Sequence, residues 1–190
     1  MKRATVIRLA TLGVLMVTLA LLAKFTVLGN YLNYKYLSEL LIGAGTMGVA
    51  IYLAAFTGGA LMNLPAMLFT ATALLVYGIP MGFPIAFAGS FVASFVHFQV
   101  VRSIGGQALA EIKIPIMQKI MSKFDSHPMR TVVILRALFF ISPPVNYLLA
   151  LSNVRNRDLV VGTLVGVLPQ IAFHATLIYF TRDWVLKAIQ

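Results

Sequence analysis

The chain is a succession of apolar runs joined by short polar segments. The first run covers residues 4–28 and begins behind basic residues at the N-terminus. A second stretch, residues 40–101, contains no Asp, Glu, Lys or Arg, and at about 20 residues per transmembrane helix it has room for three spans. Two further runs cover residues 137–154 and 159–181. The pattern predicts an all-α polytopic membrane protein, with the first run as an uncleaved anchor helix whose N-terminus lies in the cytoplasm.

The long uncharged stretch is interrupted twice by residues that break helices. The first interruption is N-L-P at 63–65, and the second is G-I-P-M-G-F-P at 78–84. Three full crossings fit this pattern. A re-entrant hairpin bent at 63–65 and followed by one crossing fits it equally well. Both arrangements place Arg102 and the basic loop after it in the cytoplasm, as the positive-inside rule requires.

The next apolar run carries its own break, because S-P-P lies at 142–144 within residues 137–154. If this run crossed the membrane, Arg155 and Arg157 would lie outside. If the run enters and returns as a hairpin, both arginines stay in the cytoplasm. The charge rule therefore favours a hairpin, followed by a full crossing over residues 159–181.

The two halves resemble an internal repeat. Pro65 lies 37 positions before Arg102, and Pro144 lies 38 positions before Arg182. Because one crossing separates the two hairpins, they are expected to enter from opposite faces. The sequence therefore predicts an inverted repeat of re-entrant hairpin plus transmembrane helix, a plan that places transport sites near the bilayer midplane. The alternative is a set of ordinary proline kinks in an unrelated bundle.

The polar segment between the halves has its own helical pattern. Apolar and charged residues alternate at helical spacing over residues 108–125, which predicts an amphipathic helix on the cytoplasmic surface, broken near Pro115. The predicted organisation is an anchor and loop at 1–39, one membrane domain at 40–182 and a short tail at 183–190. The membrane domain divides into a first half at 40–102, a linker at 103–130 and a second half at 131–182.

Composition narrows the function classes. The chain is 60% hydrophobic and 11% charged, whereas a soluble domain has about 25% charged residues. A net charge of +10 would raise the question of nucleic-acid binding, but these charges lie at the ends of apolar runs and suit membrane orientation and anionic lipid. The chain has no cysteine and only five acidic residues, which are widely spaced. We therefore expect no enzymatic activity, no catalytic residue, no cofactor, no metal and no nucleic-acid partner.

Two arginines are the leading candidates for binding a lipid headgroup. A charge at the centre of a membrane helix costs about 2.5 to 3.5 kcal/mol on insertion scales, so Arg136, inside an apolar run, is a functional candidate. Its planar guanidinium suits a phosphate, although a side chain that snorkels to the interface is the alternative. Arg102 ends a predicted span, where an orientation anchor and a headgroup ligand are equally consistent.

Polar residues at helical spacing supply further candidates. Ser90, Ser94 and His97 share one face of a predicted span, and Gln170 and His174 share one face of the last span. Such faces suit a groove for a headgroup, or close helix packing. The candidate headgroup residues are Arg136, Arg102, Asn146, Asn63, His97, His174 and Gln170, and Pro65, Pro143 and Pro144 are expected to shape the hairpin tips.

Several motifs occur together in the second half. An arginine-led apolar segment precedes P-V-N-Y at 144–147, and G-T-L-V-G-V-L-P follows at 162–169. Upstream, Phe98 and Arg102 form an aromatic-x-x-x-basic pair. In this order and spacing the motifs resemble the DedA superfamily, also called VTT-domain or SNARE-associated Golgi proteins.

The resemblance implies two opposed re-entrant hairpins and movement of phospholipid or polyprenyl-phosphate headgroups between leaflets. The sequence departs from the bacterial members in two places. Residues 63–67 lack the glutamate of their first hairpin, and Arg136 stands alone where they have an arginine pair. Scrambling down a gradient is therefore a simpler hypothesis than proton-coupled transport.

The resulting prediction is a lipid scramblase or flippase-like transporter, multi-pass in the bacterial inner membrane, with membrane lipids as its partners. Two alternatives remain open, an ion- or small-solute-coupled secondary transporter on the same fold and a non-transporting assembly factor. The sequence does not identify the lipid that is moved. It also does not fix the oligomeric state, and a homo-oligomer is one of the options.

Overall fold

The computed structural model describes residues 34–105, 126–139 and 142–189, with the backbone alone over 182–189, and isolated positions before residue 19 and at residue 122. Every element in these ranges is helical. The first half contains α3 (Tyr34–Gly43), η1 (Gly45–Met47), α4 (Gly48–Leu61), α5 (Ala66–Val76) and α6 (Gly78–Gly105). The second half contains α8 (Pro128–Phe139), α9 (Pro143–Leu151), α10 (Asn156–Gly166) and α11 (Leu168–Ile189).

Two helical segments are long and apolar enough to cross a membrane. They are α6 and the continuous stretch Asn156–Thr181, in which α11 follows α10 after a single residue. The 28 residues of α6 extend about 42 Å at 1.5 Å per residue, more than the ~30 Å hydrocarbon core. Residues 40–101 therefore hold one long helix and a pair of short helices rather than three long ones.

The second predicted interruption ends one helix and begins the next. Gly78, with φ of 71°, separates α5 from α6, and α6 then continues through Pro84. Proline is tolerated in the first turn of a helix because the N–H groups there have no intrahelical acceptor, but Pro84 lies further inside. The interruption is thus a boundary between two helices, and the chain reverses there as well as at 63–65, because Gly82 of α6 lies against Ala73 and Leu74 of α5.

The turn between α4 and α5 is a helix C-cap built on Asn63. Asn63 is the non-glycine residue with positive φ, 61°, in the described chain. Its N–H donates to the Ala60 carbonyl at 3.1 Å, and the Leu64 N–H donates to the Gly59 carbonyl at 2.8 Å. These two bonds form a Schellman motif, which satisfies carbonyls that the helix end leaves open. Pro65 follows and starts α5 in an extended conformation.

The second pair of short helices turns before a proline pair. Ser142 is extended, and Pro143 and Pro144 occupy the first positions of α9. Proline is favoured there because its fixed φ suits a helix and its missing N–H has no acceptor to lose. The S-P-P segment therefore begins a helix after a reversal of the chain.

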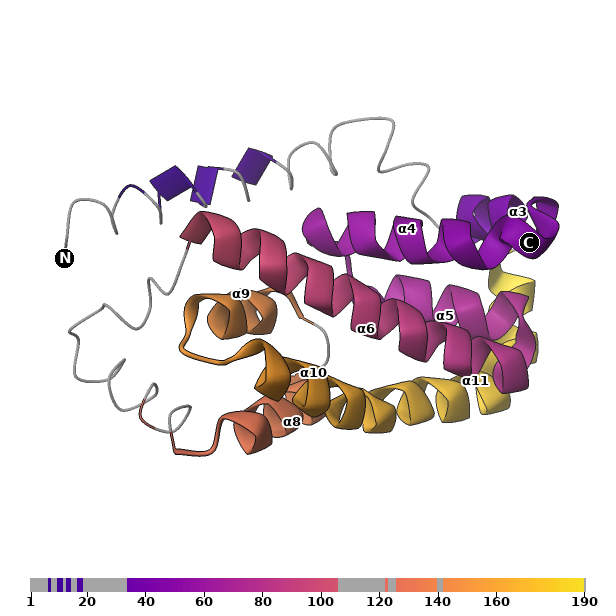
Figure 1. Cartoon of the computed structure of the whole chain (residues 1–190). Coiled ribbons are helices and arrows are strands. Elements are labelled where there is room, and N and C mark those ends of the chain that lie inside the picture. The colour runs from indigo at the N-terminus through magenta and orange to yellow at the C-terminus, as the bar shows by residue number, and fades with distance from the viewer. Residues whose placement is uncertain are drawn as a thin grey trace.

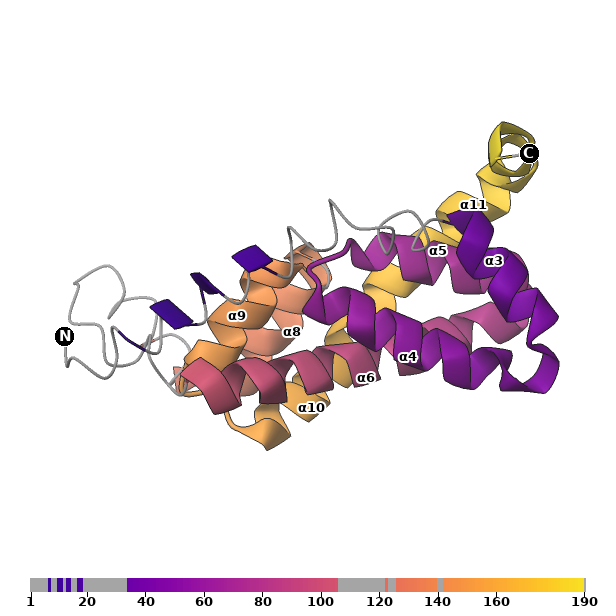
Figure 2. The ribbon, with the colours of Figure 1, turned by 90° about the horizontal axis from the view of Figure 1, so that it is seen from above.

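The two helix pairs lie toward opposite ends of α6. Figures 1 and 2 show α4 and α5 toward one end and α8 and α9 toward the other. Packing also exchanges elements between the halves, since α9 packs on α6 and α5 packs on α11. The core of the first half is built around Tyr52, Phe56 and Phe69, and the Phe56 and Phe69 rings stack at 4.8 Å. In the core of the second half, Phe98 of α6 packs with residues of α8, α9 and α10.

Glycines bring helix backbones close together at several crossings. A Cβ added at Gly82 would lie 2.4 Å from the Ala73 carbonyl oxygen of α5. A Cβ added at Gly166 would lie 2.6 Å from the Cβ of Arg136, on α8. Small residues at helix crossings are the usual means of packing helices in a membrane, where lipid removes the hydrophobic drive for association.

Two predictions of the sequence fall on residues outside the described ranges. The anchor helix at 4–28 and the amphipathic helix at 108–125 are not described as continuous elements. The Arg182 side chain, the second basic member of the predicted repeat, is also outside them.

We expect Gly166→Ala to destabilise the protein by about 1 to 3 kcal/mol, because the new methyl group overpacks the α8–α10 crossing. The matched control is Gly58→Ala in α4, where an added Cβ meets nothing within 4 Å. In the control, the better helix propensity of alanine should raise stability by about 0.5 to 1 kcal/mol. Unfolding of the purified variants in mixed micelles measures both changes, and equal effects at the two positions would contradict the packing.

Candidate functional site

A fully buried arginine lies at the centre of the second half. Arg136 has 0% exposure, and its Nη1 donates a 2.5 Å hydrogen bond to Oδ1 of Asn146, on the neighbouring helix α9. Its Nε and Nη2 have no hydrogen-bond partner among the described residues. The guanidinium does not snorkel to an interface, so the structure contradicts that alternative. A buried cation with two unused hydrogen-bond donors can bind an anionic group.

Other buried polar atoms around the long helices also lack partners within the described part of the chain. Ser90, Ser94 and His97 of α6 are fully buried, as is Thr163 of α10 to within 1%. The His97 ring packs edge-on against Tyr147 of α9 at 4.9 Å between centroids. Buried polar groups are normally hydrogen-bonded to protein, water or a ligand. These unpartnered side chains are therefore candidates for contacts with water or a polar ligand.

A cavity of about 310 Å³ opens between the two helix-pair turns and the last long helix. Asn63, Pro65, Ala66 and Met67 line it from the first turn, and Phe139, Ser142 and Pro143 line it from the second. Gln170 and His174 complete it from α11. The cavity therefore draws on three segments far apart in the sequence.

The polar groups of this cavity include donors and acceptors but no charge. Gln170 is 1% exposed, and neither atom of its amide has a partner among the described residues. His174 is positioned by Thr70 of α5, whose Oγ1 lies 3.0 Å from the His174 Nδ1. Asn63 lies near Tyr147 of α9, and its Oδ1 has no hydrogen-bond partner among the described residues. The cavity can hydrogen-bond a polar group by several side chains at once.

Arg136 lies one helical turn from this cavity on each of three helices. Phe139 follows Arg136 by three residues, Pro143 precedes Asn146 by three, and Gln170 follows the Gly166 contact by four. Since one turn takes 3.6 residues, the backbone of Arg136 lies about 5 Å from that of Phe139 along the axis of α8. The buried cation thus lies near a cavity whose lining is mostly apolar and includes a few neutral polar groups.

Arg102 is engaged at the end of α9. Its Nη2 donates to the carbonyls of Leu149 at 3.2 Å, Ser152 at 2.8 Å and Val154 at 3.1 Å. Its Nε donates to the Ala150 carbonyl, and the guanidinium carbon lies 4.5 Å from the centre of the Phe98 ring. A cation at a helix C-terminus compensates carbonyls that have no N–H partner. These contacts explain Arg102 as a cap, and its role as a headgroup ligand stays a prediction.

The predicted site residues fall into three groups. Asn63, Pro65, Pro143, Gln170 and His174 meet at the cavity, and Arg136 pairs with Asn146 one turn away. Arg102, His97 and Pro144 do not line the cavity. Sequence reasoning missed Thr70 and Tyr147, because a contact such as Thr70 to His174 joins positions 104 residues apart and leaves no local pattern.

The described residues contain no group of three His, Asp or Glu side chains that could hold a metal ion. The chain matches the model of the VTT domain over residues 64–180, which is more than half of its length. This chain belongs to the VTT-domain family, the DedA and SNARE-associated Golgi protein family. The match begins at Leu64, after Asn63 of the first turn, and includes α5, α6, the second helix pair and the long stretch in α10 and α11. Comparison with curated proteins and with solved structures gives no match.

We expect Asn146→Leu to destabilise this VTT-domain protein by about 3 kcal/mol, because it removes the hydrogen-bond partner of a buried cation. The double variant Arg136→Met with Asn146→Leu removes both polar groups and should recover most of that loss. A double-mutant cycle, measured by unfolding in mixed micelles, checks the coupling. Additive costs would show that the two side chains do not depend on each other.

The substitution Arg102→Lys tests whether Arg102 stabilises the end of α9 by hydrogen-bonding several carbonyls or by its positive charge alone. Lysine keeps the positive charge but cannot reach several carbonyls with one planar fork, so we expect a loss of about 2 kcal/mol in unfolding free energy. Ser103→Ala, at the exposed neighbour whose hydroxyl donates to its own helix, should change little. Wild-type stability in Arg102→Lys would contradict the capping role.

Proposed function

We propose that this protein lets phospholipid or polyprenyl-phosphate headgroups cross the bilayer through the cavity between its two helix-pair turns. The observation that carries the proposal is the meeting of Asn63, Gln170 and His174, three polar residues from distant segments, at one cavity next to a buried cation. In this mechanism the headgroup exchanges its water for protein hydrogen bonds while the acyl chains stay in lipid.

The proposal includes a membrane arrangement. We infer that α4 with α5, and α8 with α9, are re-entrant hairpins that enter from opposite faces, on either side of the crossing helix α6. Their helices have 14, 11, 12 and 9 residues, or about 14 to 21 Å each, which is short of the ~30 Å hydrocarbon core. The reciprocal packing of α9 on α6 and of α5 on α11 supports an inverted repeat.

Irregular backbone at membrane depth is tolerated where protein or water covers it. Both turns face the cavity, which gives their polar groups a shared environment. We further propose that the end of the molecule with Arg102, Arg130 and Arg155 lies in the cytoplasm of a bacterial inner membrane, following the positive-inside rule. The anchor residues 4–28 would then begin on the same side.

The cavity and Arg136 have different roles in this mechanism. Neutral groups of the cavity hydrogen-bond the polar parts of the headgroup, and Arg136 supplies a charge-assisted contact for the phosphate when it passes. The residues lining the cavity include no Asp or Glu. Movement down a gradient needs no titratable carboxylate, which supports scrambling over proton-coupled transport.

The test is a scrambling assay on the purified full chain in liposomes, in which a fluorescent phospholipid becomes accessible to a membrane-impermeant quencher. Wild type should expose inner-leaflet lipid faster than protein-free liposomes. Asn63→Gly keeps the positive φ of the turn while removing the amide, and Gln170→Leu removes polarity with little change in size. Each should slow exposure by about tenfold, the cost of one buried hydrogen bond.

Thr57→Val is the matched control, because the Thr57 hydroxyl donates to Leu53 of its own helix, away from the cavity. It should scramble at the wild-type rate. If wild type matches empty liposomes for both phospholipid and polyprenyl phosphate, lipid translocation is wrong, and solute transport or an assembly role takes its place. Wild-type rates in both cavity variants would move the path elsewhere.

A further inference from the structure

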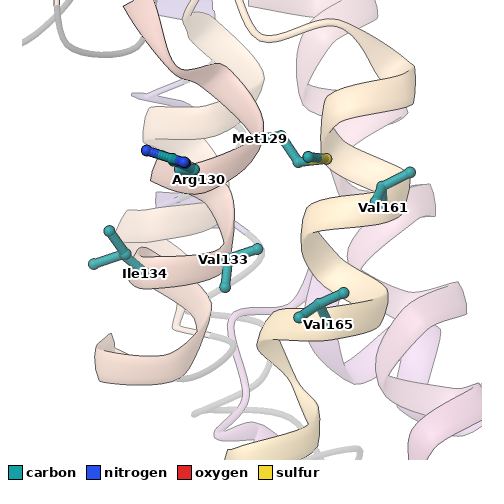
Figure 3. A pocket seen from close by; sticks show the side chains of 6 residues that line it. All are labelled: Met129, Arg130, Val133, Ile134, Val161 and Val165. Carbon is teal, nitrogen blue, oxygen red and sulfur yellow. The ribbon is translucent and has the colours of Figure 1, made fainter.

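A second hollow lies on the outside of the second half, between α8 and α10. It has a volume of about 270 Å³, and it is lined by Met129, Arg130, Val133, Ile134, Val161 and Val165. Figure 3 shows the α8 residues on one side and Val161 and Val165 of α10 on the other. Four of the apolar residues have between 44% and 55% of their surface exposed. The groove is therefore apolar and open to the side.

The two helices that form the groove run in the same direction. Gly162 lies against Val132 and the Met129 carbonyl, and one turn later Gly166 lies against Val133 and Arg136. These contacts at the two glycines form the floor, and the larger side chains on either side form the walls. Because α8 and α10 are parallel, both begin at the same end of the groove.

That end carries positive charge. Arg130 is the charged residue in the lining and lies in the first turn of α8. Arg157 lies in the first turn of α10 and is exposed. The positive ends of two helix dipoles add to these side chains. The groove is thus apolar along its length and cationic at its mouth, a pattern that fits an amphiphile with an anionic head.

We propose that the α8–α10 groove binds one anionic phospholipid of the surrounding leaflet, with an acyl chain between the valines and its phosphate on Arg130. This site lies outside the cavity proposed for translocation, and the two share no residue. The bound lipid fills the side of the crossing that buries Arg136, so it stabilises the helix pair rather than crossing the membrane.

Charge complementarity selects this occupant over others. Residues 1–33 contain four Lys or Arg and no Asp or Glu, and residues 106–125 contain three lysines against two acidic residues. Both segments are positive overall, so neither carries the net negative charge that would complement the mouth of the groove. A second copy placed across a two-fold axis would present the same groove, with positive charge at its mouth as well. An anionic phospholipid supplies the opposite charge and an apolar chain together.

The experiment uses the delipidated full chain in detergent, with phosphatidylglycerol and phosphatidylcholine of equal chain length as probes. Native mass spectrometry measures bound lipid, and thermal unfolding measures stabilisation. Wild type should bind phosphatidylglycerol more tightly and gain thermal stability from it. Arg130→Gln should weaken that binding by about tenfold, the value of a charge-assisted contact, and should weaken phosphatidylcholine binding less, because the choline cation offsets the charge of its phosphate.

Two further variants decide between a site and general surface charge. Arg155→Gln removes an arginine from the start of α10, one that pairs with Asp158 at 3.0 Å, and should keep the wild-type preference. Val161→Trp fills the groove but leaves Arg130, and should weaken binding of both lipids. The proposal is overturned if Arg130→Gln keeps the preference, if Arg155→Gln loses it equally, or if Val161→Trp binds as wild type.

The result is independent of translocation. Asn63→Gly alters the cavity and leaves the groove intact, so it should bind phosphatidylglycerol as wild type does, whatever its scrambling rate. Failure of lipid scrambling would therefore not remove the groove site, and failure of the groove site would not remove scrambling.

Discussion

The burial of one positive charge governs the second half of this protein. Removing a guanidinium from water is costly unless other groups replace the water, and Arg136 receives one replacement bond, from Asn146. To hold that charge inside, α10 approaches α8 through glycines and α9 turns back beside them. The turn that returns α9 is also a wall of the polar cavity. Charge burial, chain reversal and cavity are therefore consequences of one arrangement.

Short helices impose a second constraint, because the C-terminal end of each helix leaves backbone carbonyls without intrahelical partners. The chain meets this constraint locally at α4, where Asn63 adopts the left-handed conformation and closes a Schellman motif. It meets the constraint at α9 from a distance, through Arg102 of α6. Arg102 and Arg136 thus have different roles. Arg102 stabilises a helix end, whereas Arg136 keeps two donors unused next to a cavity.

Much of this was predictable from local pattern. The break at 63–65, the proline pair at 143–144 and the long apolar helices all follow from residues that stop, start or continue a helix. The VTT-domain resemblance was confirmed. Contacts between distant segments were not predictable. Nothing near Arg102 shows that it caps α9, and nothing near Gly78 shows that the helix beginning there continues through Pro84.

The central claim is that polar groups can enter the cavity between the two turns at membrane depth. Since the chain has no cysteine, single substitutions report accessibility directly. Ser142→Cys places a thiol in the cavity, and Leu138→Cys places one on the nearby face of α8, where Leu138 is 66% exposed. In proteoliposomes, the account predicts that a charged thiol reagent modifies the Ser142→Cys variant and spares the Leu138→Cys variant. An unreactive thiol at position 142, or equal rates at both positions, would contradict it.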